Sequence, residues 1–220
     1  IKTHLYHEAV KVDTEKKQVI IRDIKNGNIF ADSYDKLMIA TGASSIVPPF
    51  PGAELMGVHV LKTLEDGIFL KEFVAMPEIK NVTIVGGGYI GVECAEAFLN
   101  IKKNVRIIEA ADRILTPFDT EMSEIAAKEL EKHGVKLHLG EKVKGFKGTS
   151  KVEKVETDKG IYDTDLVIIA VGVRPNTAFL KDTGIQNKKN GAIIIDREMK
   201  TTVDDIYSAG DCALVYNRIT

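Results

Sequence analysis

The chain has 220 residues, of which 44% are hydrophobic, so it is long enough for one or two domains with a real core. Its 30 Lys and Arg residues against 32 Asp and Glu residues leave a net charge of -2, which excludes a basic field for nucleic acid or anionic lipid. Cys94 and Cys212 form no CxxC pair and no metal-spaced set, and no apolar run has the length of a membrane span. We therefore expect a globular protein of a reducing, cytoplasmic compartment with no metal site.

The first 77 residues predict a β-meander that ends in a buried strand, then a rigid connector and one helix. The connector is 47–52, where three prolines fix φ and remove hydrogen-bond donors. The helix is 64–75, with apolar residues at helical spacing and Met76-Pro77 behind it. The predicted strands of the meander are 10–12, 19–24, 29–31 and 37–40.

From residue 78 onward the pattern is strand, glycine loop, helix and strand, which is a βαβ unit. The first helix should bury an apolar stripe formed by Ile90, Cys94, Ala97, Phe98 and Ile101. A second helix, 119–133, should turn Met122, Ile125, Ala126 and Leu130 inward and end at a left-handed Gly134. The remaining predicted elements are the strands 82–85, 105–109, 135–139, 143–147, 152–157, 161–162 and 166–170, and the helix 92–102.

The chain contains an internal repeat. Residues 35–42 and 165–172 share Asp, Ile, Ala and Gly at a constant offset of 130 positions, and each segment follows a predicted meander. This agreement predicts a duplicated domain, the alternative being that two meanders agree by chance. In the second copy a glycine loop opens 86 positions before Gly172, and the matching loop of the first copy would precede Ile1. We therefore expect the chain to be a fragment of a longer protein.

The glycine loop carries the strongest chemical signal. Gly86, Gly88 and Gly91 have the GxGxxG spacing, follow an apolar strand and open a helix. In this context the first glycine permits a tight turn, the second allows close approach of a pyrophosphate, and the third allows close packing of helix on strand. Backbone N–H groups and the positive helix end would face the phosphates. The loop therefore predicts dinucleotide binding, with a structural glycine turn and a methyltransferase-type loop as alternatives.

An acidic residue follows the loop at the expected distance. Glu109 ends the next predicted strand, 18 positions after Gly91, where a carboxylate can accept both ribose hydroxyls of an adenosine. A 2′-phosphate would meet its negative charge, and Ala110 and Ala111 stand where an NADP site usually supplies a cation. NAD(H) is thus preferred over NADP(H), although Arg113 lies close enough in sequence to keep NADP(H) open.

Two further residues near the loop have two interpretations each. Tyr89 could cover a cofactor or pack on its neighbour, and packing is the simpler interpretation. Glu93 should lie in the first helical turn, where the helix dipole stabilises a carboxylate whether or not it has another role. Cys94 and Cys212 are interpreted as buried core thiols.

Together these features resemble the FAD-dependent pyridine nucleotide-disulfide oxidoreductases, within them the branch of NADH oxidases and coenzyme A-disulfide reductases. The order and spacing of the matching blocks agree with the family along essentially the whole chain. The blocks are 40–42 (Ala-Thr-Gly), 86–93 (Gly-Gly-Gly-Tyr-Ile-Gly-Val-Glu), 170–176 (Ala-Val-Gly-Val-Arg-Pro-Asn) and 201–211, which ends in Ile-Tyr-Ser-Ala-Gly-Asp.

The resemblance implies an α/β fold in which a Rossmann-like NAD-binding domain, a parallel sheet plus a β-meander, is inserted in an incomplete, similar FAD-binding domain. Residues 78–197 would be the NAD(H)-binding domain. Residues 1–77 and 198–220 would be two pieces of the FAD-binding domain. Full-length members dimerise through a C-terminal domain that has no counterpart here, so the parent protein is expected to be a homodimer.

The resemblance also assigns site residues. Asp211 matches the aspartate that contacts the ribityl and pyrophosphate region of the flavin, Tyr89 the ring that gates the nicotinamide pocket, and Glu93 the acid beside it. Glu109 matches the ribose contact. The full set of expected cofactor-binding residues is Gly86, Gly88, Tyr89, Ile90, Gly91, Glu93, Glu109 and Gly172 for NAD(H), and Thr41, Gly42, Gly210 and Asp211 for FAD.

These expectations describe an oxidoreductase that passes electrons from NADH through FAD to oxygen, peroxide or a disulfide such as coenzyme A disulfide. The family's redox-active cysteine has no counterpart here, so no catalytic residue is assigned and the fragment alone is expected to bind NAD(H) without completing the cycle. Its expected partners are small dinucleotides, and not nucleic acid or a membrane. The alternatives are a non-catalytic NADH-binding module and a methyltransferase.

Overall fold

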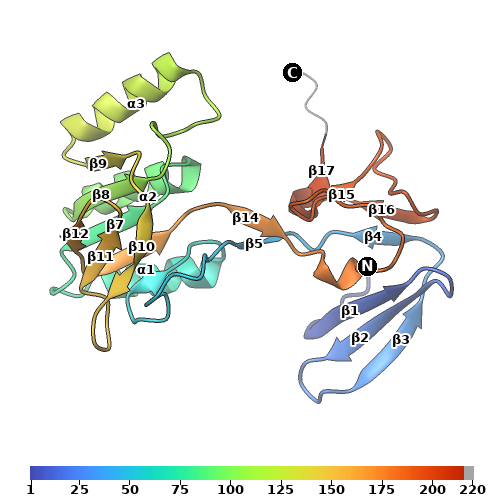
Figure 1. The fold of residues 1–220 in the computed structure, drawn as a ribbon. Helices are drawn as coiled ribbons and strands as arrows, with labels where there is room; N and C mark the ends of the chain where they lie inside the picture. Colours follow the sequence, from blue (N-terminus) through green and yellow to red (C-terminus); the bar gives the residue numbers. More distant parts are fainter. Residues whose placement is uncertain (216–220) are drawn as a thin grey trace. The chain divides into compact units, whose positions relative to one another are not determined.

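The computed structural model describes residues 1–215, which form two compact units (Figure 1). One unit combines Ile1–Ser44 with the segment that starts at Val173, and the other is Ser45–Gly172. The chain crosses between the units twice, and the strands at the two crossings, β5 (Ala43–Ser45) and β14 (Val173–Pro175), pair with each other. Within residues 1–215, no helix has the length and apolar character needed to cross a membrane.

The second unit, Ser45–Gly172, is built on a five-stranded parallel sheet. Its strands read as apolar runs, as expected for a parallel sheet that is covered on both faces. Adjacent strands are joined by crossovers, which bring the carboxyl ends of all strands to one edge. In spatial order the strands are β6 (Val58–His59), β13 (Leu166–Ile169), β7 (Asn81–Val85), β8 (Asn104–Glu109) and β9 (Lys136–Leu139).

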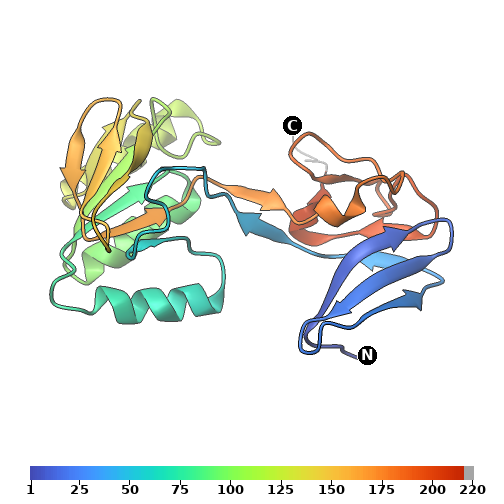
Figure 2. The same ribbon diagram turned by 60° about the horizontal axis from the view of Figure 1, so that its bottom comes forward.

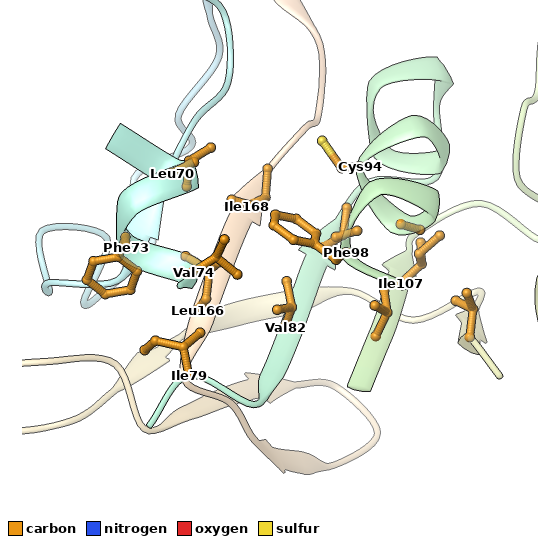
Figure 3. Packing of buried hydrophobic residues seen from close by; sticks show 14 residues of the cluster. Leu70, Phe73, Val74, Ile79, Val82, Cys94, Phe98, Ile107, Leu166 and Ile168 are labelled. Atoms are coloured by element: carbon orange, nitrogen blue, oxygen red, sulfur yellow. The ribbon is translucent and has the colours of Figure 1, made fainter. Parts of the chain in front are cut away.

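Helices cover one face of this sheet. Successive side chains of a strand point to opposite faces, so Val82 and Ile84 of β7 and Leu166 and Ile168 of β13 face the helices. Figure 3 shows this core, where Phe98 of α2 and Val74 of α1 pack against the strands. The helices are α1 (Leu64–Val74), α2 (Tyr89–Asn100) and α3 (Thr120–Lys132).

A β-meander covers the opposite face. Val85, Val167 and Ile169 point to this side and pack with Phe146 and Val155 of the meander. The sheet therefore has buried apolar residues on both faces, which explains why β13 is completely buried. The three antiparallel strands of the meander are β10 (Val143–Lys147), β11 (Lys154–Thr157) and β12 (Ile161–Asp163).

The first unit also contains a meander and parallel strand pairs. Figure 2 shows its meander as three antiparallel arrows in blue. Its core is formed by buried residues from several of these strands, among them Val12, Ile39, Ile193 and Ile206. The elements are the meander β1 (His7–Asp13), β2 (Gln18–Asp23) and β3 (Ile29–Ser33), the parallel pair β4 (Leu37–Ile39) and β16 (Ile206–Ser208), the parallel pair β15 (Ile193–Ile194) and β17 (Ala213–Leu214), and the short 3-10 helices η1 (Ala178–Leu180) and η2 (Gly210–Cys212).

The two units share the repeated pattern that the sequence predicts. In each unit a three-stranded antiparallel meander is followed by a strand that pairs in parallel, β4 in one and β13 in the other. The glycines that end the repeated segments also share a left-handed backbone, with φ of 64° at Gly42 and 112° at Gly172. An α/β fold with a parallel sheet and meanders is thus confirmed.

Helix α2 differs from its prediction in where it begins. It starts at Tyr89, three residues before the predicted residue 92, because Gly88 already serves as its N-cap. This start places Glu93 outside the first turn, so the predicted dipole stabilisation of that carboxylate is wrong. Of the predicted stripe, Ile90, Ala97 and Ile101 are exposed, and the buried face consists of Gly91, Cys94, Ala95 and Phe98.

The predicted inner face of α3 is also wrong. Met122 and Ile125 are 55% and 60% exposed, and the buried residue of the helix is Ser123. The Ser123 hydroxyl donates to the carbonyl oxygen of Ile114 at 2.6 Å, which turns this side of the helix toward the segment after β8. Helix α3 packs beside β9 at the edge of the sheet, where only Leu130 reaches the core.

The compact units divide the chain at other positions than the predicted domains. Strand β6 pairs with β13, and Leu70 and Phe73 of α1 pack in the core of the second unit, so 45–77 folds with that unit. Residues 173–197 fold with the first unit, because Ile193 belongs to its core. The predicted FAD-binding piece 198–220 includes 216–220, which lie outside the described residues.

Candidate functional site

The predicted NAD(H)-binding residues meet at the carboxyl edge of the parallel sheet. The glycine loop follows β7, Glu109 ends β8 on one side of it, and Gly172 comes three residues after β13 on the other side. Main-chain hydrogen bonds fix these neighbours, since Gly86 N donates to the Ile108 oxygen at 2.9 Å and Ala170 N to the Val85 oxygen at 2.8 Å. This edge, next to the first crossover, is where open α/β sheets bind ligands.

The three glycines of the motif differ in what a Cβ atom would meet at each position. Gly86 has φ of 108°, and a Cβ there would collide with the Ala170 carbonyl. A Cβ at Gly91 would collide with the Gly86 carbonyl, so this glycine allows the helix to lie close to the strand. At Gly88, by contrast, a Cβ would meet no atom within 4 Å. The protein therefore does not itself require glycine at position 88, and the open space there suits a ligand.

The N-terminus of α2 faces this open space without a side-chain cap. Gly88 is the N-cap residue, and the first turn contains no acidic residue. Helix α1 has the opposite arrangement, with a capping box between Thr63 and Asp66. The first N–H groups of α2 are thus left for another acceptor, and the helix dipole favours an anionic one.

Glu109 is held by the main chain on both sides. Its Oε2 accepts a hydrogen bond from Gly87 N at 2.6 Å, and its Oε1 accepts one from Ala111 N at 2.7 Å. A carboxylate oxygen can accept more than one hydrogen bond, so both oxygens can still receive bonds from a ligand. The side chain is half-buried, and the two bonds fix its orientation beside the glycine loop.

The segment 110–118 forms a wall beside the loop, and the sequence reasoning missed it. Leu115 N donates to the Gly87 carbonyl at 2.8 Å, and Ile114 is fully buried against Gly87. The ring of Phe118 meets that of Tyr89 edge to face, with centroids 5.7 Å apart. The pair Ile114-Leu115, directly after the charged Asp112-Arg113, was the available signal for this packing. Tyr89 is itself 54% exposed, and its contact with Phe118 is compatible with both interpretations, a ring packed on a neighbouring residue and a ring that covers a cofactor.

In the first unit, the predicted FAD-binding residues leave one edge of a parallel strand pair. Ile39 of β4 is the partner of Ser208 of β16, and the two chains continue into Thr41-Gly42 and Gly210-Asp211. Gly42 and Gly210 both have positive φ, of 64° and 78°. The strand pairing therefore brings the four residues to the same edge.

Asn176 clamps the Thr41-Gly42 loop, a role that the sequence did not indicate. Its side chain donates to the Thr41 carbonyl at 3.0 Å and accepts from the Ser44 hydroxyl at 2.7 Å. Its main chain adds a bond from Asn176 N to the Gly42 carbonyl at 2.9 Å, and the Thr41 hydroxyl donates to the Asn176 carbonyl at 2.7 Å. Four hydrogen bonds thus hold a loop that is exposed to solvent.

Neither cysteine has the surroundings of a reactive thiol. Burial, with a smaller contribution from the negative charge of Glu93, raises the pKa of the Cys94 thiol to about 11. The reactive form of cysteine is the thiolate, so Cys94 is inert at neutral pH. Cys212 is fully buried, and its Sγ lies 3.4 Å from the Ser208 hydroxyl. Within residues 1–215, no three His, Cys, Asp or Glu residues form a group able to hold a metal ion.

An open pocket of about 510 Å³ lies beside α1, and no predicted site residue lines it. Among its lining residues are His59, Phe69 and Ile169. His59 packs between the rings of Phe69 and Phe73, with centroid distances of 4.7 and 5.5 Å. Burial lowers the pKa of His59, against a smaller opposing effect of Asp66.

Comparison with known proteins decides the family. The family model described as pyridine nucleotide-disulphide oxidoreductase matches residues 1–220. The chain belongs to this family. The resemblance that the sequence motifs indicate is therefore confirmed, and a methyltransferase is excluded.

Two relatives align with all or nearly all of this chain. The chain in turn spans about half of their length. An NADH oxidase of Streptococcus pneumoniae is 38% identical over an alignment of 230 positions, and the match covers 98% of this chain and 50% of that protein. The NAD(P)H coenzyme A polysulfide/persulfide reductase of Pyrococcus horikoshii is 39% identical over 221 residues, 100% of this chain and 48% of the relative.

Solved structures of this family have the same fold. The water-forming NADH oxidase from Lactobacillus brevis, solved with bound NADH, has a TM-score of 0.87 to this chain and 36% sequence identity. The match covers 94% of this chain and 46% of that protein. Proteins of this family use FAD and a nicotinamide dinucleotide.

Proposed function

We propose that this chain carries the NAD(H) site and part of the FAD site of an FAD-dependent NADH oxidoreductase. One observation carries the proposal: the open space at Gly88, the uncapped N-terminus of α2 and the Glu109 carboxylate meet at the carboxyl edge of the sheet. A dinucleotide has the complementary chemistry, with an anionic pyrophosphate for the N–H groups and ribose hydroxyls for the carboxylate.

In this proposal the NAD(H) site comprises the loop glycines, Glu109 and the residues around them. Tyr89 and Ile90 are exposed at the start of α2 and are proposed to contact the nicotinamide part of the ligand, and Glu93 is exposed one turn further along the helix. Gly172 comes three residues after β13, the strand next to β7. Residues 78–197 are proposed as the NAD(H)-binding part of the chain, although 173–197 pack with the first unit.

NADH is the proposed preferred cofactor. The ionised Glu109 would accept hydrogen bonds from both ribose hydroxyls of NADH, whereas the 2′-phosphate of NADPH would meet a like charge. Ala110 and Ala111 offer no cation to offset that charge. The name of the Pyrococcus relative includes both nicotinamide cofactors, so the preference has to be measured on this chain.

Thr41, Gly42, Gly210 and Asp211 are the proposed FAD contacts. They fit a flavin nucleotide in that two loops with left-handed glycines leave the same edge of a parallel strand pair. Residues 1–77 and 198–220 are the proposed pieces of the FAD-binding region. A bound FAD would supply the acceptor for the hydride of NADH, and the residues of this chain would bind and orient the two cofactors.

The whole protein is proposed to pass these electrons to oxygen, peroxide or a disulfide such as coenzyme A disulfide. The named relatives, an NADH oxidase and a polysulfide/persulfide reductase, support this range of acceptors. They do not favour the alternative of a non-catalytic NADH-binding module. A homodimer and a cytoplasmic location complete the proposal for the whole protein.

The test is a binding titration of the 220-residue chain with NADH and NADPH, followed by the fluorescence of the nicotinamide. NADH should bind at least tenfold more tightly than NADPH. Glu109→Ala should weaken NADH by about 10- to 100-fold, because hydrogen bonds to a charged group contribute about 1.5–3 kcal/mol. Glu96→Ala, which removes an exposed glutamate from α2, is the control and should leave the affinity for NADH unchanged.

Two results would contradict the proposal. Equal or tighter binding of NADPH would refute the preference for NADH, and unchanged NADH affinity in Glu109→Ala would refute the ribose contact. A visible absorption spectrum of the purified chain tests the flavin part separately. A flavin band would show that the Asp211 and Thr41 loops hold FAD in this chain.

A further inference from the structure

A buried carboxylate lies under the meander of the second unit, outside the proposed site. Glu141, in the turn between β9 and β10, is only 4% exposed. Its Oε1 accepts hydrogen bonds from the Thr157 hydroxyl and, at 2.8 Å, from the Tyr162 hydroxyl. Its Oε2 lies 3.2 Å from Nδ1 of His138. Each partner comes from a different strand, so the carboxylate is tied to β9, β11 and β12 at once.

Such an arrangement fixes Glu141 in place. A buried carboxylate is unfavourable unless hydrogen bonds satisfy it, and here three side chains do so. Arg106 also contacts this cluster, since its guanidinium carbon lies 4.5 Å from the centre of the Tyr162 ring. The side chain of Glu141 can therefore not move without breaking several bonds in a buried place.

The main chain of the same turn is bonded to the end of β8. Glu141 N donates to the carbonyl oxygen of Glu109 at 3.0 Å, and Gly140 N donates to the carbonyl oxygen of Ala111 at 2.7 Å. Gly140 has φ of 60°, the left-handed conformation that lets both N–H groups point to β8. The turn is thus hydrogen-bonded to the residues on both sides of Ala110.

Ala111, to which the turn is hydrogen-bonded, is also one of the two donors that hold the Glu109 carboxylate. Its Oε1 accepts from Ala111 N and its Oε2 from Gly87 N. A continuous series of hydrogen bonds therefore runs from the buried Glu141 carboxylate through the turn at 140–141 and the strand end at 109–111 to the glycine loop. A displacement of the turn would move Ala111 and, with it, one of the two bonds that orient Glu109.

We propose that Glu141 is a positioning residue for dinucleotide binding, which sets the orientation of the Glu109 carboxylate and so the discrimination between NADH and NADPH. This inference rests on the proposed function. A purely structural cluster would join the meander to the sheet and stabilise the fold. It would leave the adenosine end of the ligand unaffected.

The test compares Glu141→Ala with Glu141→Gln in the 220-residue chain. Glu141→Ala removes all three side-chain bonds and should weaken NADH binding by about five- to tenfold, since small displacements of a binding group have large effects on its function. NADPH, which gains nothing from Glu109, should bind no more weakly than before, so the preference for NADH should fall by the same factor. Glu141→Gln keeps the acceptor for Thr157 and Tyr162 and should restore most of the affinity.

A double-mutant cycle separates positioning from stability. In a Glu109→Ala background, Glu141→Ala should have no further effect on NADH affinity, because the group through which it acts is already absent. Glu156→Ala breaks the ion pair with Lys147 on the same meander but removes no bond to Glu141, and it is the control that should leave the NADH preference unchanged. Melting temperatures and circular dichroism verify that each variant is folded.

The outcomes are distinct. Unchanged NADH affinity and preference in folded Glu141→Ala, with a lower melting temperature only, would overturn the inference, and so would additive effects in the cycle. If Glu141→Ala does not fold, Tyr162→Phe, which removes one hydrogen bond, takes its place with an expected two- to threefold loss. If the wild-type chain binds no NADH, the proposed function fails and not the role of Glu141 alone.

Discussion

The main-chain N–H of Gly87 lies 2.6 Å from Oε2 of Glu109, so the second residue of the glycine loop is bonded to the acidic residue at the end of the neighbouring strand. This contact within the protein joins the two parts of the proposed site, one for the pyrophosphate and one for the ribose. A charge-assisted bond of this kind is shorter and stronger than one between neutral groups. The loop and the carboxylate therefore have a fixed relative position.

The first prediction uses two neighbouring glycines as a matched pair. A Cβ at Gly88 would meet no atom within 4 Å, and its φ of -76° suits any residue. Gly88→Ala should lower the free energy of unfolding by about 0.5–1 kcal/mol, because alanine is a poorer N-cap residue than glycine. It should nevertheless weaken NADH by at least tenfold, because the methyl group would occupy the space proposed for the pyrophosphate.

Gly87→Ala, unlike Gly88→Ala, should strongly lower the free energy of unfolding. Its Cβ would lie 2.7 Å from Cγ2 of the buried Ile114, so the segment 110–118 would have to move. Overpacking of this kind destabilises by about 1–3 kcal/mol. Denaturant unfolding and NADH titration of both variants check the pair. Normal NADH binding by Gly88→Ala would show that the phosphates lie elsewhere.

The second prediction concerns the contact between Tyr89 and Phe118. Both rings are about half exposed and meet edge to face with an interplanar angle of 76°. If Tyr89 gates the nicotinamide pocket, Phe118 determines its resting position. Tyr89→Ala and Phe118→Ala should then alter NADH affinity in the same direction with a coupling of about 0.5–1.5 kcal/mol.

Tyr89→Phe is the control for this pair, since it keeps the ring contact and should retain wild-type affinity. A double-mutant cycle on NADH dissociation constants measures the coupling. Strictly additive effects of Tyr89→Ala and Phe118→Ala would show that the ring contact plays no part in binding.

The third prediction concerns the clamp on the proposed FAD loop. Asn176→Ala removes the bonds to the Thr41 carbonyl and the Ser44 hydroxyl but keeps both main-chain bonds. Each lost bond contributes about 0.5–1.5 kcal/mol, so the loop should open more often while the fold persists. Amide hydrogen exchange at Gly42 and Ala43 should become faster, and any flavin band of the chain should weaken.

Asn176→Asp is the sharper variant of the same test. The carboxylate still accepts from Ser44, but its second oxygen faces the Thr41 carbonyl, which cannot donate. Its effect on exchange at Gly42 should equal or exceed that of Asn176→Ala. Unchanged exchange in both variants would mean that the main-chain bonds alone hold the loop.

The features that sequence reasoning predicted are those that depend on local pattern. Gly86 and Gly91 are required by backbone contacts within a short loop, and the repeat around Gly42 and Gly172 follows from aligned residue types. The start of α2 was placed three residues late, because a glycine N-cap gives no side-chain signal. Local patterns therefore identified the elements better than their ends.

Contacts between distant segments were beyond such reasoning. Asn176 and Thr41 are 135 positions apart, and nothing in either segment indicates that they bond. The exposure of Met122 and Ile125 likewise depends on the position of α3 at the edge of the sheet, where no second layer reaches these side chains. Helical periodicity predicts an apolar face, but only the packing decides whether that face is covered.

The fourth prediction is a pH dependence of stability that arises from His59. Burial is the main cause that lowers its pKa from the ordinary value of 6.5. As pH falls through about 6.5, the unfolded chain binds a proton at this histidine before the folded chain does, so stability decreases until the pH reaches the folded pKa. The contribution of His59 is thus fully present above pH 6.5 and is lost below it.

His59→Phe should remove this part of the pH dependence, because phenylalanine keeps the ring contacts with Phe69 and Phe73 and does not titrate. Phe69→Ala should reduce it as well, since it uncovers the histidine and restores its hydration. Urea unfolding of the three proteins between pH 5 and 8 measures the slopes. If wild type and His59→Phe lose stability in parallel below pH 6.5, the buried histidine is not the group responsible, and the acid sensitivity comes from other titratable groups.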